Sequence, residues 1–404
     1  MKGTEPWHVP GKWSTSKHNW AAEAKRNWSL LEHVVVHDVT LRDGEQTPGV
    51  VFRKAEKVRL AHELADAGVQ RIEGGMAAVS EEDAEAIALM SREIKGVEIA
   101  SFCRVRKGDV DLSLKCNVHR VIVELSALEG SIASLFGDRQ RAVDSLVEVV
   151  SYAKKQGLQV TVFLMESSRA DLEILESLIV PSVKEGKADS VALVDTRGCL
   201  LPGGAAFLVK KYKEWTDLPV EIHCHNVWGL GTANTLAGVS AGAEVVHTCV
   251  NGLGGNVALD ECVMGLEGMM GMDTGVQTDR MLRLSKLTRE FSGLGWYKPF
   301  VGDEVSFVEA GMPVKTMWEK RHEPGMGREF LNYEVVGGAS ATVVLGKKSG
   351  RYSIMLKCWS MGLSLPSEDQ CGEMLSQVKA LSIQEKRLVR DEEFGKIYDR
   401  TMGR

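Results

Sequence analysis

Features that would direct a protein to a membrane, to nucleic acid or to secretion are missing from this chain. It has no uninterrupted apolar run of the roughly 18 residues that a membrane-spanning helix needs, and Met1 to Trp20 has no apolar core of signal-peptide type. No basic run exceeds a few residues, and the formal net charge of the 404 residues is -6. We therefore expect neither nucleic acid nor a membrane as a partner.

Paired cysteines of the metal-binding or redox type are missing too. The eight cysteines are scattered and form no CxxC pair. Several lie in strand-like or helix-like runs, where reduced thiols are buried in cytosolic proteins. With 44% hydrophobic and 26% charged residues, the composition is ordinary for a globular protein. We expect a cytoplasmic enzyme that holds any anionic substrate with local arginines.

What the chain does have is a regular alternation, because apolar β-branched runs alternate with segments of helical period from residue 34 to about residue 270. The predicted strands are Val34–Leu41, Val69–Glu73, Val97–Cys103, Arg120–Leu125, Gln159–Leu164, Ser190–Asp195, Val220–His225 and Glu244–Val250. Eight such units in about 240 residues predict an α/β fold, a (β/α)8 TIM barrel. The rival is a doubly wound open sheet, but its GxGxxG loop after the first strand is absent.

Three regions are expected along the chain. Residues 1–33 form an arm that holds four of the nine tryptophans and packs on the barrel or on a second subunit. Residues 34–292 form the catalytic barrel. Residues 293–404 form a linker and a small, mostly helical C-terminal accessory domain, with helices predicted at Ser367–Leu381 and Asp391–Arg400. We expect no separate regulatory domain.

Two histidines, His223 and His225, lie one residue apart at the end of the seventh predicted strand. Alternate residues of a strand share a face, so both imidazoles point the same way. Asp43 follows the first predicted strand. Strands seven, eight and one are consecutive around a closed barrel, and their carboxyl ends meet at one rim. Two neutral imidazoles and one carboxylate make a divalent-metal site that leaves positions open for water or substrate.

Several motifs resemble one known family. They are LRDGEQTPGV (41–50), DTRG (195–198), HCHN (223–226), NGLG followed by GN (251–256) and LGKKSG (345–350). The chain resembles the metallolyases that combine a DRE motif with a TIM barrel, and within them the Claisen-condensing 2-isopropylmalate, citramalate and homocitrate synthases. The barrel motifs are shared with 3-hydroxy-3-methylglutaryl-CoA lyase, whereas LGKKSG and the layout of residues 296–395 resemble the synthases.

The resemblance implies roles for individual residues. The metal ligands would be Asp43, His223, His225 and Asn256. Arg42 would stabilise the developing alkoxide of a 2-oxo acid, and Thr196 would bind the substrate carboxylate. The other rim candidates are Glu45 and Glu166, with a catalytic role, and Glu73, Arg104 and Arg169, which would contact substrate. Salt-bridge layers occur in any barrel, and Glu45 could instead cap a helix or pair with Arg71 or Arg104.

The implied reaction condenses an acyl-CoA, acetyl-CoA in the family, with a 2-oxo acid. The resemblance also implies a role in amino-acid biosynthesis and a homodimeric assembly. Run backwards without thioester hydrolysis, the same site would cleave a carbon–carbon bond, so a lyase is the alternative. A metal-bearing regulatory subunit is a third interpretation. Mg²⁺ or Mn²⁺ is favoured as the metal, and Zn²⁺ is the alternative because two imidazoles suit it.

The chain departs from the family pattern at three places. The synthases have a FAHESGIH-like segment with two histidines, but here Val308 and Pro313 replace both. The family's HND reads His225-Asn226-Val227, so a carboxylate that would orient a histidine ligand is lost. The glycine-rich loop before Asn256 is short and lacks the cysteine of the lyase. These departures leave the predicted metal site intact and put the substrate in question.

Overall fold

The computed structural model describes residues 7–9, 13–29, 32–294, 307–322 and 341–403. These residues divide into two compact units. The first unit comprises residues up to Gly44 and residues 54–288. The second comprises residues 45–53 and those from Arg289 onward. A short segment early in the chain therefore belongs with the C-terminal part.

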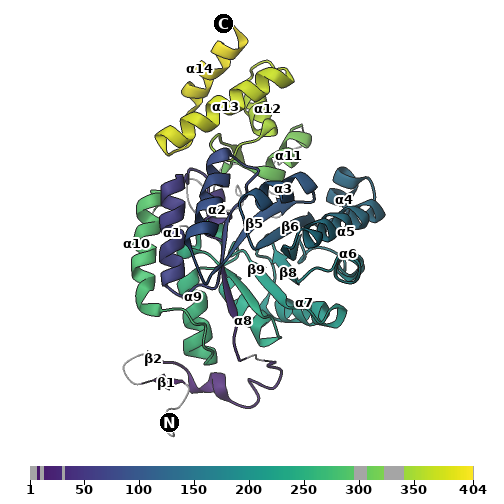
Figure 1. Cartoon of the computed structure of the whole chain (residues 1–404), viewed down its shortest axis with the longest axis vertical. Coiled ribbons are helices and arrows are strands. Elements are labelled where there is room, and N and C mark those ends of the chain that lie inside the picture. The colour runs from purple at the N-terminus through teal and green to yellow at the C-terminus, as the bar shows by residue number, and fades with distance from the viewer. Residues whose placement is uncertain (1–6, 10–12, 30–31, 295–306, 323–340, 404) are drawn as a thin grey trace. The chain divides into compact units, whose positions relative to one another are not determined.

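Eight parallel strands close into a barrel in the first unit, in the order β10-β3-β4-β5-β6-β7-β8-β9. The strands are β3 (Val35–Asp38), β4 (Arg71–Gly75), β5 (Glu98–Arg104), β6 (Arg120–Ser126), β7 (Gln159–Met165), β8 (Ser190–Asp195), β9 (Val220–Cys224) and β10 (Val245–Thr248). The predicted TIM barrel is confirmed, and Figure 1 shows its helices outside the strands. Helices cover the outer face and side chains fill the interior, so strands such as β8 are buried along their whole length.

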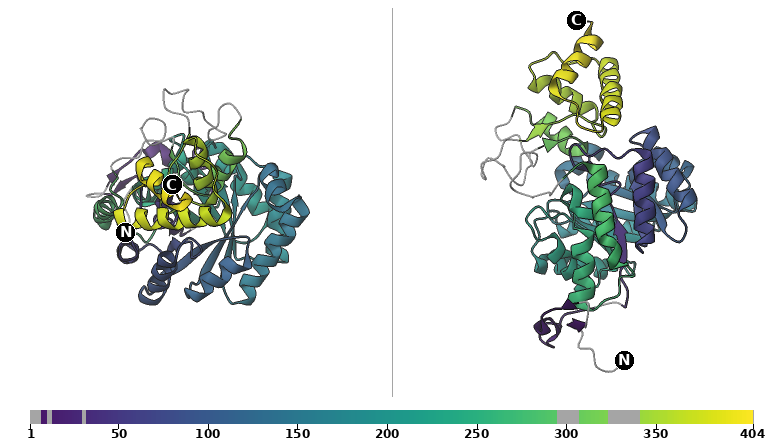
Figure 2. Two further views of the ribbon diagram at one scale, coloured as in Figure 1. Left: turned by 90° about the horizontal axis from the view of Figure 1, so that it is seen from above. Right: turned by 90° about the vertical axis from the view of Figure 1, so that its left-hand side faces the viewer.

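The helices of the first unit follow the strands in the expected alternation. They are α1 (Lys54–Asp66), α2 (Glu81–Glu93), α3 (Lys107–Lys115), α4 (Glu129–Phe136), α5 (Arg139–Lys155), α6 (Leu172–Lys184), α7 (Pro202–Trp215), α8 (Gly231–Ser240), α9 (Leu259–Met264) and α10 (Met281–Ser292), which runs into the second unit. Figure 2 shows the same ring from two further sides. Side-chain caps fix several starts: Ser80 and Asp138 accept backbone N–H groups at the first turns of α2 and α5. None of the described helices is both long enough and apolar enough to span a bilayer.

The first strand ends earlier than predicted. The sequence pattern extends it to Leu41, but β3 stops at Asp38. The Asp38 carboxylate accepts from the backbone N–H of Thr40 at 2.9 Å, and the backbone N–H groups of Arg42, Asp43 and Gly44 all converge on the carbonyl of Val39. This side-chain-capped turn bends the chain away from the strand direction. Asp43 is therefore held by a tight turn beyond the strand end.

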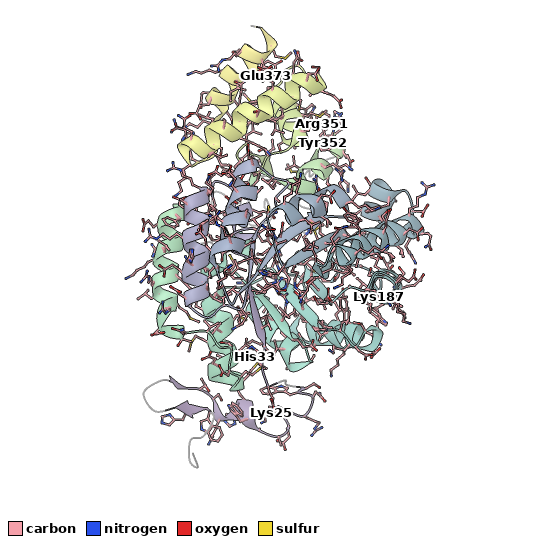
Figure 3. All side chains as sticks on the ribbon, in the orientation of Figure 1. Lys25, His33, Lys187, Arg351, Tyr352 and Glu373 are labelled. Carbon is pink, nitrogen blue, oxygen red and sulfur yellow. The ribbon has the colours of Figure 1, made fainter. Side chains whose placement is uncertain are left out.

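The described part of the N-terminal arm packs on the barrel, one of the two predicted alternatives. The Thr15 hydroxyl donates to the carbonyl of Gly268 at 2.9 Å, and the Ser29 backbone N–H donates to Ser240, the last residue of α8. The Lys25 ammonium lies 4.8 Å from the centre of the Trp20 ring. Figure 3 labels Lys25 and His33 at the end of the first unit where the arm lies. Since α8 leads into β10, the arm covers the amino ends of the strands, opposite to the predicted metal site.

The second unit is mostly helical. It contains β11 (Phe307–Val308), α11 (Gly311–Glu319), β12 (Thr342–Val343), α12 (Arg351–Ser360), α13 (Glu368–Glu385) and α14 (Asp391–Met402). The helices predicted at residues 367–381 and 391–400 correspond to α13 and α14. Ser367 and Gln370 form a capping box at the start of α13. The apolar core of the second unit is lined by Ile354, Met374, Val378, Phe394 and Tyr398.

Candidate metal centre

Asp43, His223 and His225 lie together at the carboxyl ends of the barrel strands. Strand β10 pairs with both β3 and β9, so the turn that holds Asp43 and the end of β9 are close in space. The Nε2 atom of His223 lies 3.2 Å from Asp43 Oδ2 and 3.3 Å from His225 Nε2. His225 Nε2 lies 3.7 Å from the same carboxylate oxygen. Three donor atoms thus face one another, as a single cation requires.

The charge states of these groups fit a divalent cation. Burial lowers the pKa of His223 to about 4 and that of His225 to about 4, so both imidazoles are neutral at pH 7. Burial acts to raise the pKa of Asp43, but the Arg42 guanidinium and the two histidines outweigh it and hold that pKa far below its usual range. Two neutral nitrogen donors and one charged oxygen donor are the forms that bind a metal.

The backbone of Asn256, the fourth predicted ligand, lies beside this group. It forms an isolated antiparallel bridge with His225, and its side-chain amide donates to the carbonyl of Leu253 at 2.9 Å. The adjacent Gly254 has φ of +69°, and a Cβ there would lie 2.8 Å from the carbonyl oxygen of Asp43. Only glycine lets this short loop approach the metal group so closely.

Arg42 is fixed against Glu73, a second predicted site residue. Its Nε donates to one carboxylate oxygen of Glu73, and Nη2 lies 3.2 Å from the other. Its guanidinium stacks 3.9 Å over the Phe102 ring. Nη1, the remaining nitrogen, lies 3.3 Å from Asp43 Oδ2. The Arg42 guanidinium is therefore directed toward the metal group, and its contacts with Glu73 hold it in that orientation.

A second cluster contains three more predicted residues, at the ends of β7 and β8. Glu166, whose φ is +64°, accepts from Arg169 at 3.3 Å and from Arg197 at 2.8 Å. Its backbone N–H donates to the Thr196 hydroxyl at 2.7 Å. Strand β8 adjoins β9, and the His225 N–H donates to the carbonyl of Asp195. Thr196 and the two arginines thus lie on the rim next to the metal group; Arg197 was not predicted, although it lies within the DTRG motif.

Two predicted site residues have partners elsewhere. Arg104 forms a bidentate pair with Asp109 on α3, at 2.8 and 2.9 Å. Glu45 belongs to the second unit, where its carboxylate accepts from the Phe52 backbone N–H at 2.8 Å and from Lys347 at 3.2 Å. A buried lysine of the LGKKSG motif thus pairs with Glu45, and the alternative pairing with Arg71 or Arg104 stays a prediction.

A second group of the same composition, His37, Glu221 and His247, was not predicted from the sequence. All three side chains are fully buried, and their donor atoms lie within 4.8 Å of one another. On β9, Glu221 shares the inward face with His223, and His247 lies opposite His37 in the pairing of β10 with β3. The available signal was strand parity: a charged or imidazole side chain at an inward position of a buried strand needs a partner inside the barrel.

The two departures that replace side chains, at Val227 and at Val308 and Pro313, have clear structural settings. Val227 is buried and offers no polar atom to His225. Val308, on β11, packs in an apolar cluster with Val314, Met317 and Leu356. Pro313 lies in the first turn of α11, and His322 is exposed with its ring edge toward Trp359. None of these side chains except that of His322 can carry a proton.

Comparison with known proteins places the chain in a family. A sequence profile described as HMGL-like matches residues 33–288. The homocitrate synthase AksA of Methanopyrus kandleri is 36% identical over 367 residues, which are 89% of this chain and 90% of that protein. A putative (R)-citramalate synthase CimA of the same organism is 36% identical, with coverages of 91% and 72%. 2-Isopropylmalate synthase 2 of Caldanaerobacter subterraneus is 35% identical, with coverages of 91% and 95%.

Solved structures share the fold at lower identity. An HMG-CoA lyase from Bacillus subtilis superposes with a TM-score of 0.60 at 21% identity, covering 67% of this chain and 97% of that one. The carboxyl transferase domain of Rhizobium etli pyruvate carboxylase gives a TM-score of 0.56 at 19% identity, covering 89% and 63%. The profile match, the synthase relatives and the barrel with its metal-type group agree: this chain belongs to the HMGL-like family, in the Claisen-condensing branch of the DRE-TIM metallolyases.

Proposed function

We propose that the protein is a divalent-metal-dependent acyltransferase that condenses an acyl-CoA, with acetyl-CoA as the expected donor, with a 2-oxo acid. The relatives with similarity over most of the chain are named homocitrate, citramalate and 2-isopropylmalate synthases. The single observation that carries the proposal is the convergence of Asp43, His223 and His225 beside the fixed guanidinium of Arg42. A substrate carbonyl group bound here would contact both the metal ion held by these residues and the Arg42 guanidinium.

Asp43, His223 and His225 would hold the cation, with Asn256 beside them. When bound there, a divalent cation would polarise the carbonyl group of the 2-oxo acid. Two imidazoles and a carboxylate accept Mg²⁺, Mn²⁺ or Zn²⁺, and we propose Mg²⁺ or Mn²⁺ because the open positions would take oxygen ligands from the substrate.

Arg42 would stabilise the negative charge that develops on the carbonyl oxygen. Glu73 occupies two of its nitrogens and the Phe102 ring covers its face. The guanidinium is therefore fixed before the substrate arrives, and Nη1 remains directed toward the metal group. A preorganised donor of this kind needs no rearrangement in the transition state, which is where its contribution to catalysis arises.

The cluster at the ends of β7 and β8 would bind the carboxylate of the 2-oxo acid. The Thr196 hydroxyl already accepts from the Glu166 N–H, which leaves its proton available for a carboxylate oxygen. Arg169 and Arg197 supply positive charge, and Glu166 holds both of them. The predicted catalytic role of Glu166 stays a prediction, and its contacts support a role in orienting the arginines. Roles for Arg104 and Glu45 in catalysis, a homodimer and a cytoplasmic location also stay predictions.

Carbon–carbon bond formation removes a proton from the methyl group of the acyl-CoA and joins that carbon to the keto carbon of the 2-oxo acid. Hydrolysis of the thioester then releases CoA with a free thiol. We therefore propose to incubate the purified protein with acetyl-CoA, a divalent salt and one of a panel of 2-oxo acids, and to follow thiol release with a chromogenic disulfide. Release that depends on one 2-oxo acid, and that His223→Ala abolishes, is the expected result.

A carbon–carbon lyase is the second candidate, and one observation favours it. Val308 and Pro313 offer no proton carrier where the synthase pattern has histidines. Cleavage in the lyase direction removes the hydroxyl proton and protonates the released carbanion, and water can supply that second proton more easily than a base can remove one from an acyl-CoA methyl group. Silence in the thiol assay together with cleavage of a tertiary hydroxy acid would identify the lyase. Silence in both assays, with a divalent ion bound, would instead support a regulatory subunit.

A further inference from the structure

We propose that His247 and Glu221 form a buried positioning chain that fixes the ring and the tautomer of His223, and so sets the affinity of the metal centre. This inference rests on the metal site of the proposed function. The Nδ1 atom of His223 lies 3.2 Å from Nδ1 of His247. The Nε2 atom of His247 lies 2.8 Å from Oε2 of Glu221. This hydrogen-bonded chain of side chains therefore runs from the metal-facing nitrogen of His223 through two imidazole rings to the Glu221 carboxylate.

Each proton position in this chain follows from the next one. The Glu221 carboxylate accepts hydrogen bonds, so the facing Nε2 of His247 carries the proton. A neutral His247 then has a bare Nδ1, which can only accept. The facing Nδ1 of His223 must therefore be the donor, and its proton leaves Nε2 bare. Nε2 is the atom that faces Asp43 and His225, so the chain selects the tautomer of His223 that can bind a cation.

Glu221 is a rigid end for this chain. Its other oxygen, Oε1, accepts from Arg71 at 2.8 Å, from the Ser190 hydroxyl at 2.6 Å and from the Thr161 hydroxyl at 3.1 Å. The side chain is fully buried, so these contacts compensate for the water that the carboxylate has lost. Arg71 is held in turn by Glu98 at 2.6 Å. A carboxylate fixed by three donors keeps His247, and through it His223, in one orientation.

The same proton assignment argues against a second metal ion between His37, Glu221 and His247. A cation there would need the lone pair of His247 Nε2, which would move the His247 proton to Nδ1. His223 Nδ1 would then have to accept, and its proton would block the Nε2 atom that faces Asp43. Occupation of the two groups is therefore mutually exclusive. His37 contributes little to the chain, because its nitrogens lie 3.6 Å from Glu73 and 3.8 Å from Glu221.

Metal affinity of the full-length protein tests the chain. Dissociation constants for Mn²⁺ are measured by titration calorimetry, and bound metal is counted by mass spectrometry. His247→Leu removes both hydrogen bonds and is expected to weaken binding by about 10- to 100-fold, as outer partners of metal ligands do. His247→Asn keeps an acceptor near His223 Nδ1 and should recover most of the affinity. His37→Phe is the matched control from the same buried group, and it should bind one ion as tightly as the native protein.

The outcomes separate the chain from the metal centre. Wild-type affinity in a folded His247→Leu protein overturns the positioning chain while leaving the metal site in place. Loss of one of two bound ions in His37→Phe overturns it as well, because that result would place an ion in the buried group. Retention of the ion by His223→Ala contradicts the metal centre of the proposed function itself. If His247→Leu does not fold, ¹⁵N-histidine NMR of the native protein decides: a proton on His247 Nε2 supports the chain, and one on Nδ1 overturns it.

Discussion

Two groups inside the barrel have the same composition, two histidines and one carboxylate, and in each the donor atoms lie within 4.8 Å of one another. In the rim group, Nε2 atoms of His223 and His225 face Asp43, and the His225 side chain is 16% exposed. In the buried group, His37, Glu221 and His247 have no exposed surface. Arg71 and two hydroxyls already bind the Glu221 carboxylate, whereas the rim carboxylate is contacted by Arg42 and the histidines.

The difference shows that residue type and spacing do not make a metal site by themselves. A cation needs donor lone pairs that no other donor occupies and a path for exchange with solvent. The rim group meets these conditions better, because its two Nε2 atoms are directed at the Asp43 carboxylate and the His225 side chain is partly exposed to solvent. In the buried group, Glu221 and His247 already use their facing atoms in hydrogen bonds, and the His37 side chain has no exposure to solvent. We interpret this group as support for the rim group. Substitutions that treat the two groups alike should therefore give unequal results.

The largest expected effect comes from removing one histidine from each group. His223→Ala deletes a metal ligand, so the protein should lose its divalent ion and with it the thiol-releasing activity, a larger loss than the 10- to 100-fold typical of outer partners. His37→Ala should keep both. Metal content after gel filtration and initial rates measure the difference. Equal loss in the two variants would remove the distinction between the groups.

Breaking the charge pair of the buried group should affect stability instead. Arg71→Met leaves Glu221 without its cation, and removal of one partner from a buried pair costs about 3–5 kcal/mol of unfolding free energy. Arg104→Met is the control: that arginine is 44% exposed beside Asp109, and its loss should cost about 1 kcal/mol or less. Urea denaturation of the metal-free proteins compares them. Similar midpoints would mean that the buried network contributes little.

The rim group should respond in turnover. Arg42→Lys keeps the positive charge but loses the fork that Glu73 and the substrate share, so kcat should fall about 10²- to 10³-fold with metal affinity unchanged. Steady-state rates and Mn²⁺ titration are measured on the same preparation. A normal kcat with weakened metal binding would reassign Arg42 to holding the metal ligand Asp43.

Asp38 is a third case, a buried carboxylate with neither a cation nor an arginine. Burial raises its pKa to about 7, and its Oδ2 has no hydrogen-bond partner among the described residues. The folded state then binds a proton more tightly than the unfolded state, so its contribution to stability is complete below pH 4 and is lost as the pH rises through 7. The native protein should lose on the order of 2 kcal/mol of unfolding free energy from this group between pH 5 and pH 8, and Asp38→Asn should abolish that loss. Unfolding curves at the two pH values measure it, and an unchanged pH dependence in the variant would contradict the assignment.

Sequence patterns were sufficient for the barrel and for the core of the rim group. The eight strands carry nearly continuous apolar β-branched runs, as strands buried on both faces do, and each prediction overlaps the observed strand. Barrel order alone brought Asp43 to His223 and His225. The end of the first strand was missed because a side-chain hydrogen bond of Asp38, which the pattern does not show, turns the backbone there.

Tertiary partners of charged residues could not be predicted in the same way. Glu45 lies two residues after Asp43, yet it belongs to the second unit and pairs with Lys347. A lysine about 300 positions away in the sequence leaves no local signal near Glu45. His247 and Glu221 were hidden for a related reason, since each lies in a short strand where no neighbour in the sequence is its partner. Their inward parity was readable, but their partners depend on the register between strands.

The anomalous scattering of Mn²⁺ in crystals of the full-length protein tests the central claim most directly. We predict a single peak in the barrel, at about 2.0–2.2 Å from Nε2 of His223, Nε2 of His225 and an oxygen of Asp43. The buried group should show none. A peak between His37, Glu221 and His247, with no density at Asp43, would contradict the account.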